Sequence, residues 1–225
     1  MSISFLVTLH NNHALRYKYL KSMLEGIRSD KDEIIVINII NNYRQTESIS
    51  LSEDKWIKTI DLFNISDDFK AKMIAAGHAT NEYLSFLDPY GWMSKGGRSK
   101  AIDYLKTGDS KSVVFGNCYK VNPLNGLYYR ALNRSNVSLN SLIFHKNSLD
   151  GFKNNSISTN ISLYQKLSSE GQVYSFSNDM DYLEFIKYDN FDITTAAKCI
   201  GTNHDKKVDS RISKILKSYK KIIIS

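Results

Sequence analysis

The chain of 225 residues is poor in cysteine and proline. Its two cysteines, Cys118 and Cys199, are too few and too far apart for a disulfide framework or a cysteine-based metal cluster, so we expect reduced thiols in the cytoplasm. Only two prolines and a hydrophobic share of 42% exclude a linker-rich or disordered chain. The length suits one domain with a single large core.

Long apolar runs and a leader segment are missing as well. No apolar run approaches the roughly 18 residues of a membrane-spanning helix. A strand-like apolar run follows Met1 directly, without a basic leader or a cleavage site. We therefore expect neither a transmembrane span nor a signal peptide.

Positive charge is concentrated at one end of the chain. The formal net charge is +7, and residues 203–225 hold seven Lys and Arg side chains against two Asp. A nearly neutral body with a basic tail is not the pattern of a nucleic-acid-binding fold. We predict a folded domain over residues 1–200 and a basic amphipathic tail over residues 201–225. Contact with an anionic membrane surface and packing of the tail on the domain or on a second copy are alternatives.

Apolar periodicity predicts an α/β fold with a mostly parallel central sheet flanked by helices. In the first half, strands are expected at residues 3–9, 33–40, 55–61 and 83–87, and helices at 14–28 and 69–80. In the second half, we expect a flexible pair at Gly96 and Gly97, a helix at 99–106, a hairpin-like or irregular segment at 126–131, a helix at 161–167, and strands at 112–121, 140–145 and 173–176.

The apolar run at residues 83–87, YLSFL, stops abruptly at Asp88. Pro89 and Gly91 mark the point where the strand ends and the chain turns away. Ligands of open α/β sheets bind beyond the carboxyl ends of the strands, which makes Asp88 a candidate binding residue. A turn-forming Asp before Pro is the alternative.

Four stretches, taken in order, resemble the family 2 glycosyltransferases with the GT-A fold: SFLVTLHNN, EIIVINIINN, AAGHATNEYLSFLDPYGW and NSLIFHKNSLDGFKNN. The resemblance implies a GT-A-like single domain with a C-terminal basic helix. It implies an inverting glycosyltransferase whose first candidate donor is a UDP-sugar. The implied acceptor is a saccharide of a bacterial surface polysaccharide, such as O-antigen, capsule or lipopolysaccharide. A lipid-linked acceptor and a peripheral position on the inner membrane face would suit the basic tail.

The resemblance also implies a nucleotide-binding set: Thr8, His10, Asn11, Asn38 and Asp88. Asn38 stands where the family has a uracil-contacting Asp, and an amide can still hydrogen-bond a base edge. For His10, a solvated loop position is the alternative. The Asp-Pro-Tyr at residues 88–90 keeps only the first carboxylate of the family's Asp-x-Asp motif.

The family's metal ligands and catalytic base are only partly present. Asp88 and Asp189 are the candidate ligands of a magnesium or manganese ion, because hard cations prefer oxygen ligands. Asn160 occupies the place of the family's catalytic base and cannot take a proton at neutral pH. Asp88 and Asp150 are the remaining catalytic candidates, and Asp150 is also explained as a plain turn residue.

Trp92, Lys95 and Arg98 follow Asp88 and are candidates for binding the acceptor or the leaving group. An indole face can stack on a sugar, and bases in a mobile loop can neutralise a departing diphosphate without a metal. Core packing of Trp92 and a solvated basic face are the alternatives.

The missing acids motivate a second hypothesis, a catalytically silent relative that binds a nucleotide sugar or supports an active partner transferase. A nucleotidyltransferase is disfavoured because residues 8–15, TLHNNHAL, contain no glycine for a triphosphate-binding loop.

Overall fold

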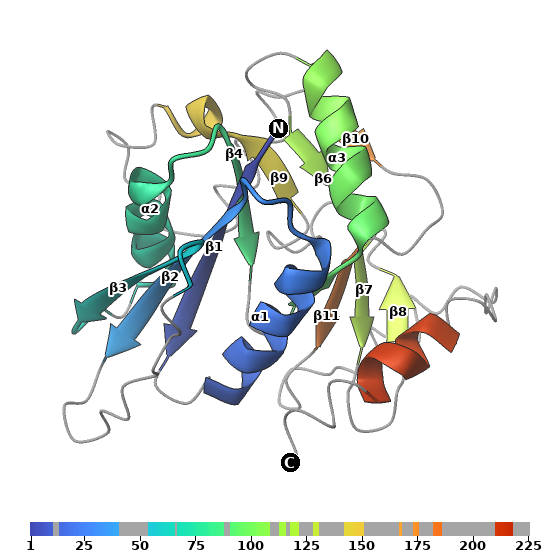
Figure 1. Ribbon diagram of the computed structural model, residues 1–225, viewed down its shortest axis with the longest axis horizontal. Coiled ribbons are helices and arrows are strands. Elements are labelled where there is room, and N and C mark those ends of the chain that lie inside the picture. Colours follow the sequence, from blue (N-terminus) through green and yellow to red (C-terminus); the bar gives the residue numbers. More distant parts are fainter. Residues whose placement is uncertain are drawn as a thin grey trace.

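A seven-stranded, mostly parallel sheet forms the centre of the fold (Figure 1). The computed structural model describes residues 1–10, 14–40, 54–65, 67–87, 91–108, 113–115, 118–121, 128–130, 142–150, 167, 173–175, 182–185 and 210–217. In spatial order, the strands of this sheet are β10 (Val173–Ser175), β6 (Val113–Phe115), β9 (Leu142–His145), β4 (Tyr83–Leu87), β1 (Ile3–His10), β2 (Glu33–Ile40) and β3 (Ile57–Phe63). Only β9 runs antiparallel to its neighbours.

A second, four-stranded sheet lies beside the first. Its strands, in order, are β5 (Gly91–Met93), β11 (Tyr182–Phe185), β7 (Cys118–Val121) and β8 (Tyr128–Arg130). The prediction of one strand over residues 112–121 is wrong, because β6 and β7 belong to different sheets. β5 and β11 were not predicted. Strands of three or four residues are too short to show an alternating pattern, and a continuous apolar run does not reveal a change of sheet.

Helices cover both faces of the large sheet. α1 (Ala14–Ile27) and α3 (Lys95–Thr107) pack on one face, and α2 (Asp68–His78) and the short 3-10 helix η4 (Lys146–Leu149) pack on the other. Successive side chains of a strand point to opposite faces. In β1, Phe5 therefore belongs to the same core cluster as Leu20 of α1, and Leu6 to the same cluster as Ala75 of α2.

The interior of the sheet is apolar on both faces, as expected for a parallel sheet between two helical layers. Phe5, Phe86 and Phe144 are among the largest side chains that are fully buried. Full burial of such a side chain stabilises the fold by about 1.5–3 kcal/mol relative to exposure. The mixed α/β architecture with a central sheet and flanking helices confirms the predicted fold class.

The predicted elements of the first half are confirmed closely, and those of the second half less so. The helix expected at 99–106 begins four residues earlier, at Lys95, and its first turn contains the glycine pair that we predicted to be flexible. The Ser94 side chain caps this helix by accepting a hydrogen bond from the Gly97 amide at 2.8 Å. Of the helix predicted at 161–167, only Leu167 is described.

Residues 210–217 of the basic tail form a helix, drawn in red in Figure 1. Ile212 and Leu216 are 2% and 9% exposed, whereas Lys214 and Lys217 are exposed. The apolar side of this helix is therefore covered by protein. Among the helices that the structure describes, none is both long and apolar enough to span a membrane.

Candidate functional site at the carboxyl edge of the sheet

The carboxyl ends of β1, β2, β3 and β4 lie along one edge of the large sheet, because these strands are parallel. Thr8 and His10 stand at this end of β1, and Asn38 stands at this end of β2. β4 ends at Leu87, immediately before Asp88 in the sequence. Three predicted site residues, Asn11, Asp88 and Asp189, lie outside the described residues.

A partly buried polar cluster joins the end of β1 to the first turns of α2. Thr8 Oγ1 donates a hydrogen bond to Asp68 Oδ1 at 2.7 Å, and Lys72 Nζ donates to Asp68 Oδ2 at 2.5 Å. Thr8 and Lys72 are 5% and 6% exposed. Asp68 thus holds a hydroxyl and an ammonium group in fixed positions at the ligand-binding edge.

The charge state of Asp68 follows from its neighbours. Burial raises the pKa of Asp68, but the charge of Lys72, the hydrogen bonds from Lys72 and Thr8, and the charge of His10 outweigh this effect. The net result is a pKa below the ordinary value of 3.8. Such a carboxylate is a weak base, so Asp68 is suited to orient its neighbours rather than to accept a proton.

Asn38 lies on the opposite face of the sheet from Thr8. Ile37 and Ile39 of β2 pack in the cluster on the α2 side, so the alternation of the strand turns Asn38 toward the α1 side. There, Asn38 Nδ2 donates a hydrogen bond to Asp61 Oδ1 of β3 at 3.1 Å. Thr8 and Asn38 therefore lie at the same edge of the sheet but on opposite faces.

Arg98 is far from this edge, which corrects the prediction of a leaving-group role. Its Nε donates to Asp32 Oδ2 at 2.9 Å, and its Nη2 donates to Asp32 Oδ1 at 2.7 Å. Asp32 also accepts hydrogen bonds from the Ile3 and Ser29 amides, both at 2.8 Å, at the amino ends of β1 and β2. The expected mobile basic loop is instead the ordered first part of α3.

Asp150 is also displaced from the expected position. The antiparallel β9 pairs His145 with Tyr83, the first residue of β4, and η4 and Asp150 follow this pair. β4 is five residues long, so Asp150 lies roughly 15 Å from the carboxyl edge along the strand direction. This exposed residue ends η4, and the placement does not fit its predicted role as the base.

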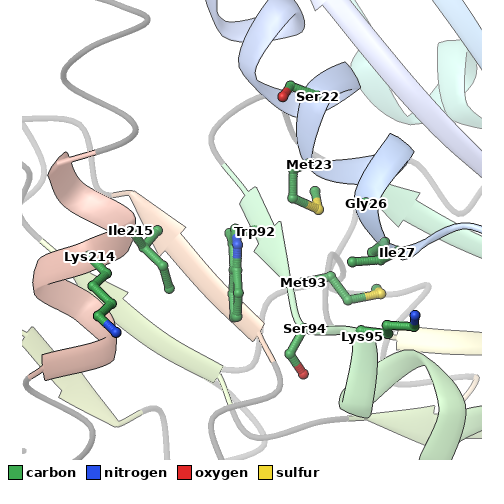
Figure 2. Close-up of a pocket in the computed structure, with 10 residues that line it drawn as sticks. All are labelled: Ser22, Met23, Gly26, Ile27, Trp92, Met93, Ser94, Lys95, Lys214 and Ile215. Carbon is green, nitrogen blue, oxygen red and sulfur yellow. The ribbon is translucent and has the colours of Figure 1, made fainter.

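Trp92 and Lys95 meet in one pocket, of about 430 Å³, beside α1 (Figure 2). Its walls come from three segments: the second half of α1, the chain from β5 into α3, and the helix at residues 210–217. The predicted pair is thus brought together, and the tail supplies Lys214 and Ile215 to the same pocket.

Sequence reasoning missed Asp61, Asp68 and Lys72. Of the neighbouring Asp67 and Asp68, Asp67 caps α2 by accepting hydrogen bonds from the Phe69 and Lys70 amides. The carboxylate of Asp68 instead accepts hydrogen bonds from Thr8 and Lys72. The signal available in the sequence was the i,i+4 spacing of Asp68 and Lys72.

A metal site is not formed by the described part of the chain alone. Within those ranges, no three His, Cys, Asp or Glu side chains lie close enough together to hold an ion. The predicted ligands Asp88 and Asp189 both fall outside these ranges, so their pairing stays a prediction.

No protein-family model and no curated protein matches the sequence. Solved structures of TarS from S. aureus do. TarS 1–349 in complex with UDP-GlcNAc is 15% identical, with a TM-score of 0.62 over 99% of this chain and 72% of that chain. The complex with UDP is 16% identical, with a TM-score of 0.57 over 97% and 70%. A longer TarS structure is 16% identical, with a TM-score of 0.60 over 100% of this chain but 44% of that one. At these identities the likeness shows the fold, and this chain has the mixed α/β fold of the glycosyltransferase TarS.

Proposed function

We propose that the protein is a glycosyltransferase that takes a sugar from a nucleotide-diphosphate sugar, with a UDP-sugar as the first candidate. The observation that carries this proposal is the parallel sheet whose carboxyl edge presents Thr8, His10 and Asn38. Nucleotides bind at this edge of open α/β sheets. The likeness in fold to TarS structures that hold UDP and UDP-GlcNAc supports the same assignment.

On the donor side, each polar residue of the edge has a distinct task. The Asn38 amide, held by Asp61, hydrogen-bonds the base edge. On the other face of β1, Asp68 pairs with Lys72 and accepts a hydrogen bond from Thr8, so this cluster borders the donor as a polar group without net charge. Asp88, which follows β4, holds the ribose or a metal ion.

The transfer itself requires a base and a counter-charge. The acceptor hydroxyl attacks the anomeric carbon, the bond from that carbon to the diphosphate oxygen breaks, and the hydroxyl proton passes to a base, with inversion. Asp88, which follows β4 in the sequence, is the catalytic candidate of this proposal.

A magnesium or manganese ion bound by Asp88 and Asp189 would offset the charge of the diphosphate. The carboxylate oxygens of these two residues suit such a hard cation. Titration of the protein with manganese by calorimetry, with and without UDP, tests this part of the proposal. Asp88→Asn and Asp189→Asn should each abolish the metal-dependent gain in UDP affinity.

We further propose a bacterial setting on the cytoplasmic side of the inner membrane, with a saccharide or lipid-linked saccharide acceptor of a surface polysaccharide. The exposed Lys214 and Lys217 of the tail support contact with an anionic membrane surface. Since Ile212 and Leu216 are covered by protein, this contact would be electrostatic and peripheral.

A catalytically silent relative is the second candidate, and a specific observation favours it. Asp150 is on the opposite edge of the sheet, and Asn160 stands where the resemblance expects the catalytic base. Such a protein would bind a nucleotide sugar or support a partner transferase without turnover.

Calorimetry with UDP and UDP-GlcNAc, followed by a turnover assay with a panel of UDP- and GDP-sugars, separates these candidates. Binding with transfer or hydrolysis supports the enzyme, and binding without turnover supports the silent relative. Absence of nucleotide binding refutes both. Thr8→Val should weaken UDP binding, whereas Thr107→Val, an exposed threonine at the far end of α3, serves as the matched control.

A further inference from the structure

Asn38 and Asp61 stand directly opposite each other in the parallel pair of β2 and β3. Asn38 Nδ2 donates a hydrogen bond to Asp61 Oδ1 at 3.1 Å. A carboxylate offers only acceptors, whereas an amide offers donors at its nitrogen and an acceptor at its oxygen. Asp61 therefore fixes which way the Asn38 amide is turned: the nitrogen faces β3, and the oxygen faces away from β3.

The carbonyl oxygen of Asn38 is left as an acceptor for another group. Asn38 is only 8% exposed, and no donor within the described ranges hydrogen-bonds its Oδ1. In the same ranges, the side-chain polar atoms that are sealed from solvent without a partner belong to Ser85 and Ser148, so solvent reaches Asn38 Oδ1. An acceptor that is fixed in direction, nearly buried and still open to solvent suits a ligand that carries a hydrogen-bond donor.

Asn38 lies beside the place where a sheet of this topology binds ligands. β2 and β3 follow β1 on one side, and β4 lies on the other side of β1. Ligands of open α/β sheets bind beyond the carboxyl ends of the two strands at such a reversal, here β1 and β4. Neighbouring strands are about 4.8 Å apart, so Asn38 on β2 is one strand spacing away from this point. The carboxyl ends of these four strands are the donor edge of the proposed function.

The charge of Asp61 decides which part of a nucleotide sugar can lie at Asn38. Asp61 is exposed at the donor edge, and a carboxylate repels the negatively charged diphosphate. The uncharged nucleoside therefore lies on the side of β2 and β3, and the diphosphate lies toward β1 and β4. This orientation brings the base to the free oxygen of Asn38.

We propose that Asp61 is a positioning residue that sets the base specificity of the donor site; this inference rests on the proposed function. By holding the Asn38 amide, Asp61 presents an acceptor to the base. Uracil carries an N–H donor at N3, which Asn38 Oδ1 accepts, whereas cytosine carries an acceptor at N3. Two acceptors that face each other leave both without a partner, so uridine diphosphates are selected over cytidine diphosphates.

Calorimetry with UDP and CDP tests this selection. We expect the unaltered protein to bind UDP at least about tenfold more tightly than CDP. In Asp61→Asn, the amide at this position can donate or accept, so the Asn38 amide is no longer fixed in one direction. The preference for UDP over CDP should then fall about fivefold or more, because UDP binding weakens while CDP binding improves. Asp61 is exposed, so this variant should fold normally.

A double variant that exchanges the two side chains provides a rescue. Asn38→Asp combined with Asp61→Asn keeps the net charge and moves the carboxylate from β3 to β2. The amide on β3 then donates to this carboxylate, which can still accept the N–H of uracil. The preference for UDP should return to within about threefold of the original value. Asp103→Asn, at an exposed position of α3, is the matched control and should leave both affinities unchanged.

Equal binding of UDP and CDP by the unaltered protein would overturn the inference, and so would an unchanged preference in Asp61→Asn. A double variant that is folded by circular dichroism but stays unselective would overturn it as well. If CDP binds as well as UDP and 2′-deoxy-UDP binds more weakly, Asn38 recognises the ribose instead of the base. Failure of the unaltered protein to bind UDP would refute the proposed function, whereas UDP binding without discrimination refutes only the role of Asp61.

Discussion

Arg98 and Asp32 form a buried, two-point ion pair that joins the first turns of α3 to the residue before β2. The side chain of Asp32 is 0% exposed and that of Arg98 is 11% exposed. Asp32 also accepts hydrogen bonds from two backbone amides, so both of its carboxylate oxygens have more than one hydrogen-bond donor. The pair therefore stabilises the amino edge of the sheet and orients the helix that borders the pocket.

Asp32→Asn should lower the free energy of unfolding by about 3–5 kcal/mol, because it leaves the buried Arg98 charge without a partner. Urea denaturation followed by circular dichroism measures this change. The control is Asp103→Asn, which removes the exposed i,i+3 partner of Lys106 and should cost no more than about 0.5 kcal/mol. Similar losses for the two variants would contradict the importance of the buried pair.

The stability of the protein should fall in acid partly through Asp68. Its pKa in the folded protein is lowered below the ordinary value of 3.8, so the folded state favours the carboxylate. This stabilising contribution is fully present above the unfolded pKa and is lost as the pH falls through the folded pKa. Asp68→Asn should be less stable at neutral pH, and its stability should decline less below about pH 4.

The pH dependence of Asp68→Asn is checked by urea denaturation at several pH values between about 2.5 and 7. Asp67→Asn is a close control, because the amide oxygen can still cap α2. A parallel acid profile for Asp68→Asn and the unaltered protein would show that this carboxylate does not contribute to acid unfolding.

Asn38→Asp should make stability depend on pH near the donor edge. The substitution places a second carboxylate beside Asp61, whose oxygen now lies 3.1 Å from the Asn38 amide nitrogen. Like charges at this distance disfavour double ionisation, so the pKa of one of the two carboxylates should rise. The variant should therefore be less stable than the original protein at pH 7, and the difference should shrink toward acidic pH. Thermal unfolding at both pH values tests this, and a pH-independent difference would contradict it.

Ile212→Asp should release the tail helix from the domain. Ile212 is 2% exposed, and a buried unpaired carboxylate is strongly unfavourable. Hydrogen exchange of residues 210–217 should accelerate in this variant. The neighbouring Ser213 is exposed, so Ser213→Asp should leave the exchange unchanged. Slow exchange in both variants would show that the helix does not depend on this contact.

The local structure of the first half could be predicted because local periodicity encodes burial. Residues 33–40 are apolar almost throughout, as a strand covered on both faces must be, and they form β2. Thr8, His10 and Asn38 could be assigned to strand ends from the same patterns. The second half was predicted less well, because strands of three or four residues, such as β5 and β11, carry too few side chains to show a period.

The amino-acid sequence by itself determined the α/β alternation and the position of polar residues at strand ends, since both depend on neighbours within a few residues. Only the tertiary structure decided which groups meet. Because β9 runs antiparallel to β4, Asp150 lies at the opposite edge of the sheet. Arg98 pairs with Asp32, which is 66 positions away in the sequence. The pocket likewise combines Met23, Trp92 and Lys214 from three distant segments. Such contacts depend on how the layers pack, and packing is set by the whole chain rather than by any local pattern.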